Sequence, residues 1–164
     1  MDKISKNISY KEGVKSNTAK QYNIENIPND FQLSNMKMVA NHCFQPLREA
    51  YGAAIGISSF LRSKTLNEHW RINGSKTSQH LQGLYSKMEE GAIDIDADIY
   101  DNGITNAQIF EFLKDNVEFD QLIWEYGTDE EPAWVHVSFR KGANRGMLLT
   151  ATKLGRKTKY TLRK

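Results

Sequence analysis

Two short segments of the sequence alternate between apolar and polar residues, and this pattern constrains the fold more than any other feature. Residues 93–96 read Ile-Asp-Ile-Asp, and residues 134–138 read Trp-Val-His-Val-Ser. Successive side chains of a β-strand point to opposite faces, so each segment is predicted to be a strand with aliphatic residues on one face. We therefore expect a sheet that buries one face and presents Asp94 and His136 on the other.

A third candidate metal ligand, His80, lies in the stretch Ser-Gln-His-Leu-Gln-Gly at residues 78–83. A catalytic zinc site typically takes three protein ligands from His and carboxylate side chains and keeps a fourth position for water. Cys43 is the only cysteine, which excludes a disulfide within the chain and a cysteine-based metal cage. A metal would therefore have to bind to His and carboxylate, and His80, Asp94 and His136 are the candidates.

The composition is that of an ordinary globular protein. Its 164 residues are enough for one domain, and 39% of them are hydrophobic while 26% are charged. We expect a single domain over residues 1–164, with residues 1–30 as an N-terminal arm. No segment resembles a secretory signal or a membrane span, so we expect synthesis in the cytoplasm and no membrane association.

The net charge of +2 is unevenly distributed. Residues 141–164 carry eight Lys or Arg and no Asp or Glu, whereas the preceding residues are net acidic. This basic tail is typical either of a contact with nucleic acid or anionic wall polymer, or of a solvated hairpin whose lysines keep an edge strand from pairing with other chains. We favour the hairpin and expect no nucleic-acid partner.

Hydrophobic periodicity and turn residues predict an α+β fold. We expect a short helix within residues 10–22, a helix over residues 30–51 kinked at Pro46 and ended by Gly52, and a helix over residues 105–116 capped by Thr105. Strands are predicted at residues 54–61, 119–126 and 134–139, the last two as an antiparallel pair, followed by a hairpin at residues 147–152 and 158–162. These elements form a small antiparallel sheet with helices packed on one side.

Several motifs occur in a characteristic order along the chain. They are Arg62-Ser63, Leu66-Asn67, Gly74-Ser75, Ser78-Gln79-His80, Gly83, Ala92, Asp94-Ile95-Asp96 and Trp134-Val135-His136-Val137-Ser138. In them the chain resembles the zinc D-alanyl-D-alanine carboxypeptidase family, in its phage-type, endolysin-like branch of peptidoglycan peptidases. The resemblance implies the hedgehog/DD-peptidase fold, Zn2+ as cofactor, and His80, Asp94 and His136 as its ligands. His42 and His69 are interpreted as ordinary packed or exposed histidines.

The spacing between the first two ligands departs from the family pattern. His80 and Asp94 are fourteen positions apart, which is twice the family's spacing. We interpret residues 84–91 as containing an insertion, an extended flap near the rim of the site, which keeps Ala92-x-Asp94 in the family register. Asp96, Glu89 and Glu90 are alternative second ligands.

A peptidase of this kind also needs a carboxylate that takes a proton from water and passes it to the leaving amine. Related zinc peptidases often carry it three residues before the last histidine, but that residue is Ala133. Glu125 is the preferred candidate because it matches an acidic strand position of the family. Glu131 and Asp129, on the following loop, are the alternatives.

Substrate contacts are expected from four residues. Arg62 matches the arginine that the family uses on its substrate, and a forked guanidinium suits a peptide carboxylate or carbonyl. Ser78, Gln79 and Trp134 are the other three.

The resemblance implies a zinc metallopeptidase that hydrolyses an amide bond in the peptide stem of bacterial peptidoglycan, either endolysin-like or D-Ala-D-Ala carboxypeptidase-like. We expect a monomer that acts on the cell wall after release or as part of a phage particle. The alternative is a non-catalytic, zinc-containing cell-wall-binding or virion structural module of the same fold.

Overall fold

The N-terminal region forms a small antiparallel hairpin and two short helices. The computed structural model describes residues 3–164, beginning with β1 (Lys3–Ser5), β2 (Ile8–Ser9), α1 (Tyr10–Val14) and α2 (Asn17–Gln21). The single helix expected within residues 10–22 is therefore two helices. They are separate because Ser16 is extended and its side chain accepts a hydrogen bond from the Ala19 amide, which starts a new helix.

The long helix expected over residues 30–51 is present in three parts. These are α3 (Asp30–Val39), the π-helical turn η1 (Ala40–Phe44) and α4 (Gln45–Tyr51). The sequence prediction placed the irregularity at Pro46, whereas the helix widens in the turn before it. Pro46 then lies in the first turn of α4, where its missing N–H is tolerated. The predicted stop is confirmed, because Gly52 ends α4 in the left-handed conformation, with φ of 61°.

Six strands form the main sheet. Their spatial order is β3 (Gly56–Ser59), β4 (Glu90–Asp96), β6 (Trp134–Arg140), β5 (Gln121–Glu125), β7 (Met147–Leu154) and β8 (Lys157–Leu162). The predicted antiparallel pairing of β5 with β6 and the predicted β7–β8 hairpin are both confirmed.

The expectation of a purely antiparallel sheet is wrong, because β5 and β7 are parallel. After β6 the chain returns to the start of β5 before it enters β7. There the Gly146 amide donates to the carbonyl of Phe119 and the Met147 amide donates to the carbonyl of Asp120. These bonds start β7 beside β5 in the same direction, so the sheet is mixed.

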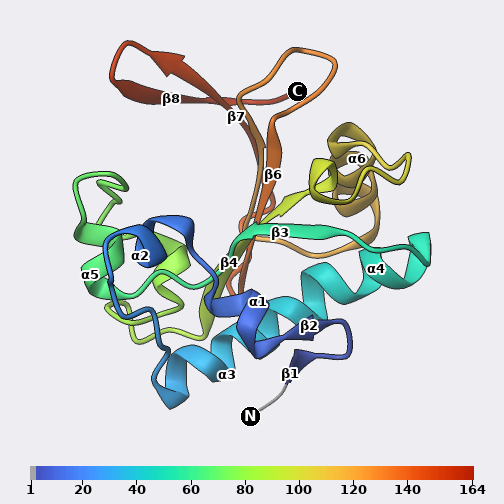
Figure 1. Cartoon of the computed structure of the whole chain (residues 1–164). Helices are drawn as coiled ribbons and strands as arrows, with labels where there is room; N and C mark the ends of the chain where they lie inside the picture. The colour runs from blue at the N-terminus through green and yellow to red at the C-terminus, as the bar shows by residue number, and fades with distance from the viewer. Residues whose placement is uncertain (1–2) are drawn as a thin grey trace.

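The two faces of this sheet differ, as the alternating segments predicted. On one face, the aliphatic residues of β4 and β6 pack in the main core against α3, η1, α4 and α6 (Asn106–Asn116), which Thr105 caps as expected. On the other side lie α5 (Lys64–Glu68) and the 3-10 turn η2 (Gln79–Leu81), while η3 (Ala97–Tyr100) follows β4. The expectation of helices on one side only is therefore wrong, because short helical segments also cover the polar face (Figure 1). Figure 1 shows the strands between α6 on one side and α2 and α5 on the other.

Within residues 3–164, none of the helices has the length and apolar character needed to span a bilayer.

Candidate metal centre

The structure brings His80, Asp94 and His136 together on the polar face of the sheet. Asp94 and His136 are directly opposite each other in the β4–β6 register, and His80 comes from η2. One ligand atom from each of the three residues lies within 4.8 Å of the others. Asp94 Oδ1 is 2.8 Å from His136 Nδ1 and 3.1 Å from His80 Nε2. All three residues are buried.

The hydrogen bonding of His80 fits a cation at this cluster. Its Nδ1 lies 2.9 Å from the carbonyl oxygen of Phe60. A carbonyl only accepts, so Nδ1 carries the proton and the lone pair of neutral His80 is on Nε2. This lone pair then faces another acceptor, Asp94 Oδ1, at 3.1 Å. A cation bound by both atoms removes this conflict, and a second partner on the other ring nitrogen is what metal-binding histidines typically have.

The protonation states also suit metal binding. Burial lowers the pKa of His80, which favours the neutral imidazole. Burial alone would raise the pKa of Asp94, but the neighbouring imidazoles of His80 and His136 outweigh it and lower this pKa well below its usual range. A neutral imidazole and an ionised carboxylate are the forms that bind a metal cation.

Side-chain amides hold the turn that carries His80. From α3, Gln32 Nε2 donates to the carbonyl of Leu81 and Asn35 Nδ2 donates to the carbonyl of Gln82, both at 3.0 Å. Gln82 is completely buried, and its amide donates to the carbonyls of Phe60 and Ala92. The His80 turn is thereby fixed to α3, to the end of β3 and to β4. None of these amides was predicted from the sequence to have a role.

The cluster opens into a cleft of about 820 Å3 on the polar face of the sheet. Its floor includes Ile123 and Glu125 of β5, and one wall is the segment of residues 72–79. The opposite wall comes from β7 and β8, through Met147, Leu149, Thr158, Tyr160 and Leu162. The basic tail thus forms part of the cleft. The sequence prediction for this segment was a solvated hairpin.

Glu125, the preferred candidate for the general base, lies beside the three candidate ligands. It lines the same cleft as the three candidate ligands and is only 7% exposed. Burial, together with the charge of Asp94, raises its pKa from 4.5 to about 7. A carboxyl group with a pKa near neutrality can both take up and release a proton under physiological conditions.

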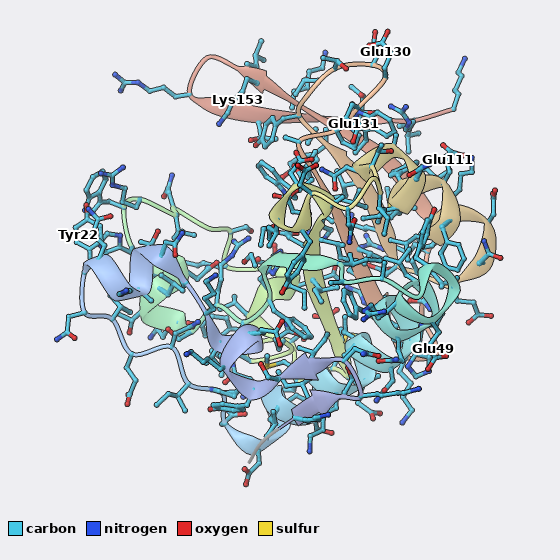
Figure 2. The ribbon with its side chains drawn as sticks, turned by 45° about the vertical axis from the view of Figure 1, so that its right-hand side comes forward. Tyr22, Glu49, Glu111, Glu130, Glu131 and Lys153 are labelled. Carbon is cyan, nitrogen blue, oxygen red and sulfur yellow. The ribbon has the colours of Figure 1, made fainter. Side chains whose placement is uncertain are left out.

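The two alternative bases lie elsewhere. Both carboxylate oxygens of Glu131 accept from the first amides of α6, at 2.6 Å from Asn106 N and 3.2 Å from Ala107 N. Asp129 is exposed on the loop and does not line the cleft. Figure 2 shows the neighbouring Glu130 at the outer end of this loop and Glu131 next to α6. Glu131 therefore stabilises a helix end, and Glu125 is the carboxylate beside the cluster.

Glu131→Ala should reduce stability and leave catalysis intact. The substitution removes the acceptor for two helix amides, which costs about 1 to 2 kcal/mol of unfolding free energy. Urea denaturation would measure this loss, and peptide hydrolysis by the metal-loaded variant should stay within about twofold of the wild type. A collapse of hydrolysis with unchanged stability would instead place Glu131 in the reaction.

The expected substrate-binding residues have different environments. Arg62 and Trp134 are half-buried and line the cleft, where the Trp134 ring packs 5.2 Å from that of Tyr126. Among residues 3–164 no carboxylate lies within ion-pair distance of the Arg62 guanidinium, so it is available to a ligand. Ser78 also lines the cleft and its Oγ accepts from the His80 amide.

Gln79 has a structural partner. Its amide nitrogen donates to the completely buried Asp120 at 3.0 Å, and Arg145 makes a bidentate ion pair with the same carboxylate. These contacts fix the residue next to His80 to the start of β5. The role of Gln79 toward substrate stays a prediction.

Residues 84–91 do not form the expected extended flap. Residues 84–86 are a turn, and Glu90 and Gly91 already belong to β4. None of the three alternative ligands is part of the cluster. Glu90 accepts from Arg140 at 2.8 Å, Glu89 pairs with Lys141, and Asp96 accepts from the Asp98 amide and the Asn106 side chain. The exposed part of the segment lines a separate pocket of about 340 Å3, which borders the main cleft at Thr77 and Ser78.

Replacing residues 85–88 with Gly-Ser-Gly-Ser should leave the metal site intact. Tyr85 and Met88 are 47% and 40% exposed and the segment supplies none of the three candidate ligands, so metal content and melting temperature should stay close to wild type. We expect a changed preference among peptide substrates, measured by mass spectrometry of the products, because the segment lines a pocket that borders the cleft. Loss of metal would show that this segment holds the site.

A comparison with protein families supports the geometry. A family model described as Peptidase M15 matches residues 6–138, which is more than half of the chain. The matched region contains the three candidate ligands, Arg62 and Glu125, and it ends before β7 begins. No curated protein matches the chain.

Proposed function

The chain belongs to the peptidase M15 family, and on that basis we propose that it is a zinc metallopeptidase that hydrolyses an amide bond in the peptide stem of bacterial peptidoglycan. The observation that carries this proposal is the buried group of His80, Asp94 and His136 at one cleft of a peptidase-family chain. Membership in this family supports peptidase activity. The three candidate ligands support the presence of a bound metal ion. We further propose that the substrate is peptidoglycan and that the fold is of the hedgehog/DD-peptidase type.

The ligand set suits zinc, since two imidazoles and one carboxylate are a common set of protein ligands in catalytic zinc sites. When bound there, Zn2+ would supply a Lewis acid that polarises the scissile carbonyl and acidifies water. His80 Nε2, Asp94 Oδ1 and His136 Nδ1 are the atoms that would hold it.

Glu125 would move the proton. Glu125 follows Ile123 by two residues on the same face of β5, and Ile123 is directly opposite His136. This register places the carboxylate beside the cluster, where it would take a proton from the attacking water and give it to the leaving amine. Its burial keeps bulk water from competing for the proton.

Arg62 would orient the peptide. Its backbone amide donates to the carbonyl of His80 at 3.0 Å, so the side chain starts from a fixed point beside a metal ligand. A guanidinium there can form paired hydrogen bonds with a carboxylate, or a single strong bond with a carbonyl, of the bound peptide. Together with Trp134, it would hold the scissile bond over the cluster. We propose that the enzyme acts as a monomer.

Digestion of purified peptidoglycan tests the proposal. Zinc-loaded protein should release shortened stem peptides, identified by mass spectrometry, and a chelator should abolish their release until zinc is restored. The identity of the bond would separate an endolysin-like activity from a D-Ala-D-Ala carboxypeptidase-like one. Zinc-loaded protein that binds the polymer without cutting it would favour the non-catalytic wall-binding module, the alternative that Ala133 in the expected acid position supports.

A further inference from the structure

The hairpin of β7 and β8 lies outside the matched region, yet it forms one wall of the cleft. The family match ends at residue 138, and the hairpin begins at Met147. In Figure 1 the hairpin extends above the rest of the sheet, on the same side as the loop that follows α5. Residues from both segments line the same cleft. The region matched by the family model thus supplies the candidate reacting groups, and the hairpin outside that region supplies one wall of the cleft around them.

The hairpin is fixed to the sheet. β7 is hydrogen-bonded along β5, and the hydroxyls of Tyr126 and Thr158 are 2.6 Å apart. On the opposite face, the Arg163 guanidinium lies 3.8 Å from the centre of the Trp124 ring, and its backbone amide donates to the carbonyl of Leu148. The side chains that the hairpin presents to the cleft therefore start from a rigid backbone.

The strand register shows which chemistry the wall presents. Ile123, Leu149 and Leu162 are neighbours across β5, β7 and β8, and Ile123 is next to His136 across β6. These residues form a continuous aliphatic row, the apolar strip, which runs from a candidate metal ligand to the outer strand. Ile123 and Leu149 are buried, but Leu162 is 74% exposed.

Tyr160 stands in the neighbouring row. Glu125, Ala151 and Tyr160 are adjacent across β5, β7 and β8, and all three side chains are on the cleft face. The small side chain of Ala151 leaves space between the carboxylate and the phenol. Tyr160 is 55% exposed and so is accessible to a ligand beside the general base.

We propose that the β7–β8 hairpin is the substrate-recognition wall of the cleft, with the apolar strip binding an aliphatic side chain next to the scissile bond and Tyr160 contacting the peptide backbone beside Glu125. The inference rests on the proposed function, because its ligand is the substrate peptide. The apolar strip is continuous with the metal cluster, so a peptide with its carbonyl at the cluster has its adjacent side chain within reach of Leu149 and Leu162. An exposed leucine at this position becomes buried when substrate binds, and the burial of its apolar surface stabilises the complex.

A matched pair of leucines tests the wall. Leu162 and Leu154 belong to the same hairpin and are 74% and 64% exposed, but Leu154 does not line the cleft. Leu162→Ala should raise KM for soluble muropeptides, prepared by muramidase digestion, about tenfold with kcat little changed. Leu154→Ala should leave both constants at the wild-type values. Tyr160→Phe should reduce kcat/KM about threefold to tenfold, as loss of one hydrogen bond does.

Binding without turnover gives a second measurement. In a zinc-loaded Glu125→Gln background, calorimetry with the same muropeptides should show about tenfold weaker binding for Leu162→Ala than for Leu154→Ala. Equal dissociation constants and equal KM values for the two leucine variants would overturn the inference while the proposed function stands. Failure of the zinc-loaded wild type to bind or cut any muropeptide would overturn both.

Discussion

His80→Ala and His136→Ala should each lose the bound metal and with it peptide hydrolysis. Each substitution removes one of the three ligand atoms that meet at the cluster. Loss of a hydrogen-bond partner around a metal ligand already costs about tenfold to a hundredfold in affinity, so loss of a ligand should cost at least a hundredfold. Elemental analysis of protein purified without chelator should find one zinc per wild-type chain and almost none in either variant.

The chain contains its own controls for this experiment. His42 stacks on Phe139 with ring centroids 4.3 Å apart, and His69 packs beside Tyr22 and Trp70. Neither is part of the cluster, so His42→Ala and His69→Ala should keep the metal. A wild-type protein that holds no zinc and takes up none on dialysis would refute the metal proposal, and zinc loss in all four variants would point to a general effect on folding.

The parts of the site that lie on strands were predictable from the sequence. In 93–96 and 134–138 a period of two separates aliphatic from polar residues, which fixes the side of the sheet that Asp94 and His136 face. The structure places them opposite each other in neighbouring strands. His80 was harder, because no periodicity describes a 3-10 turn. Its position depends on hydrogen bonds from Gln32 and Asn35, which lie far away in the sequence, and from Gln82 to the distant Phe60 carbonyl.

The parallel pairing of β5 with β7 and the outer wall of the cleft were not predictable in this way. Residues 147–162 read as a hairpin whether it lies at the edge of the sheet or against the site. Long-range hydrogen bonds from Gly146 and Met147 decide its position. Likewise, the acidic loop after β5 gave no sign that Glu131 caps α6, because a cap of this kind joins residues 25 positions apart.

Glu125→Gln should keep the metal and the fold but lose peptide hydrolysis by on the order of a hundredfold or more, the usual consequence of removing a general base. The amide is nearly the same size as the carboxylate and cannot take up the proton. Single-turnover kinetics of the zinc-loaded variant, with metal content as the control, would measure the loss.

The pH dependence follows from the same carboxylate. A general base acts in its ionised form, so kcat/KM should rise with pH through the pKa of Glu125, which is about 7 in the metal-free protein. A cation at the cluster offsets the charge of Asp94 and stabilises the ionised form, so the rise in the zinc enzyme should occur at or below pH 7. The residual activity of Glu125→Gln should lack this step.

Stability should change in the opposite direction from activity. The pKa of Glu125 is 4.5 before burial and about 7 in the fold, so the fold favours the protonated form. The stabilisation from this difference is complete below pH 4.5 and is lost as pH rises through 7.

At pH 8 the metal-free wild type therefore carries a buried charge that Glu125→Gln lacks, and the variant should be more stable by on the order of 2 kcal/mol. Urea denaturation of the metal-free proteins at pH 8 and pH 4.5 would measure this gain, which should vanish at the lower pH. A variant that is less stable at pH 8 and still active would show that Glu125 is a structural carboxylate. The general base would then have to be another residue that lines the cleft.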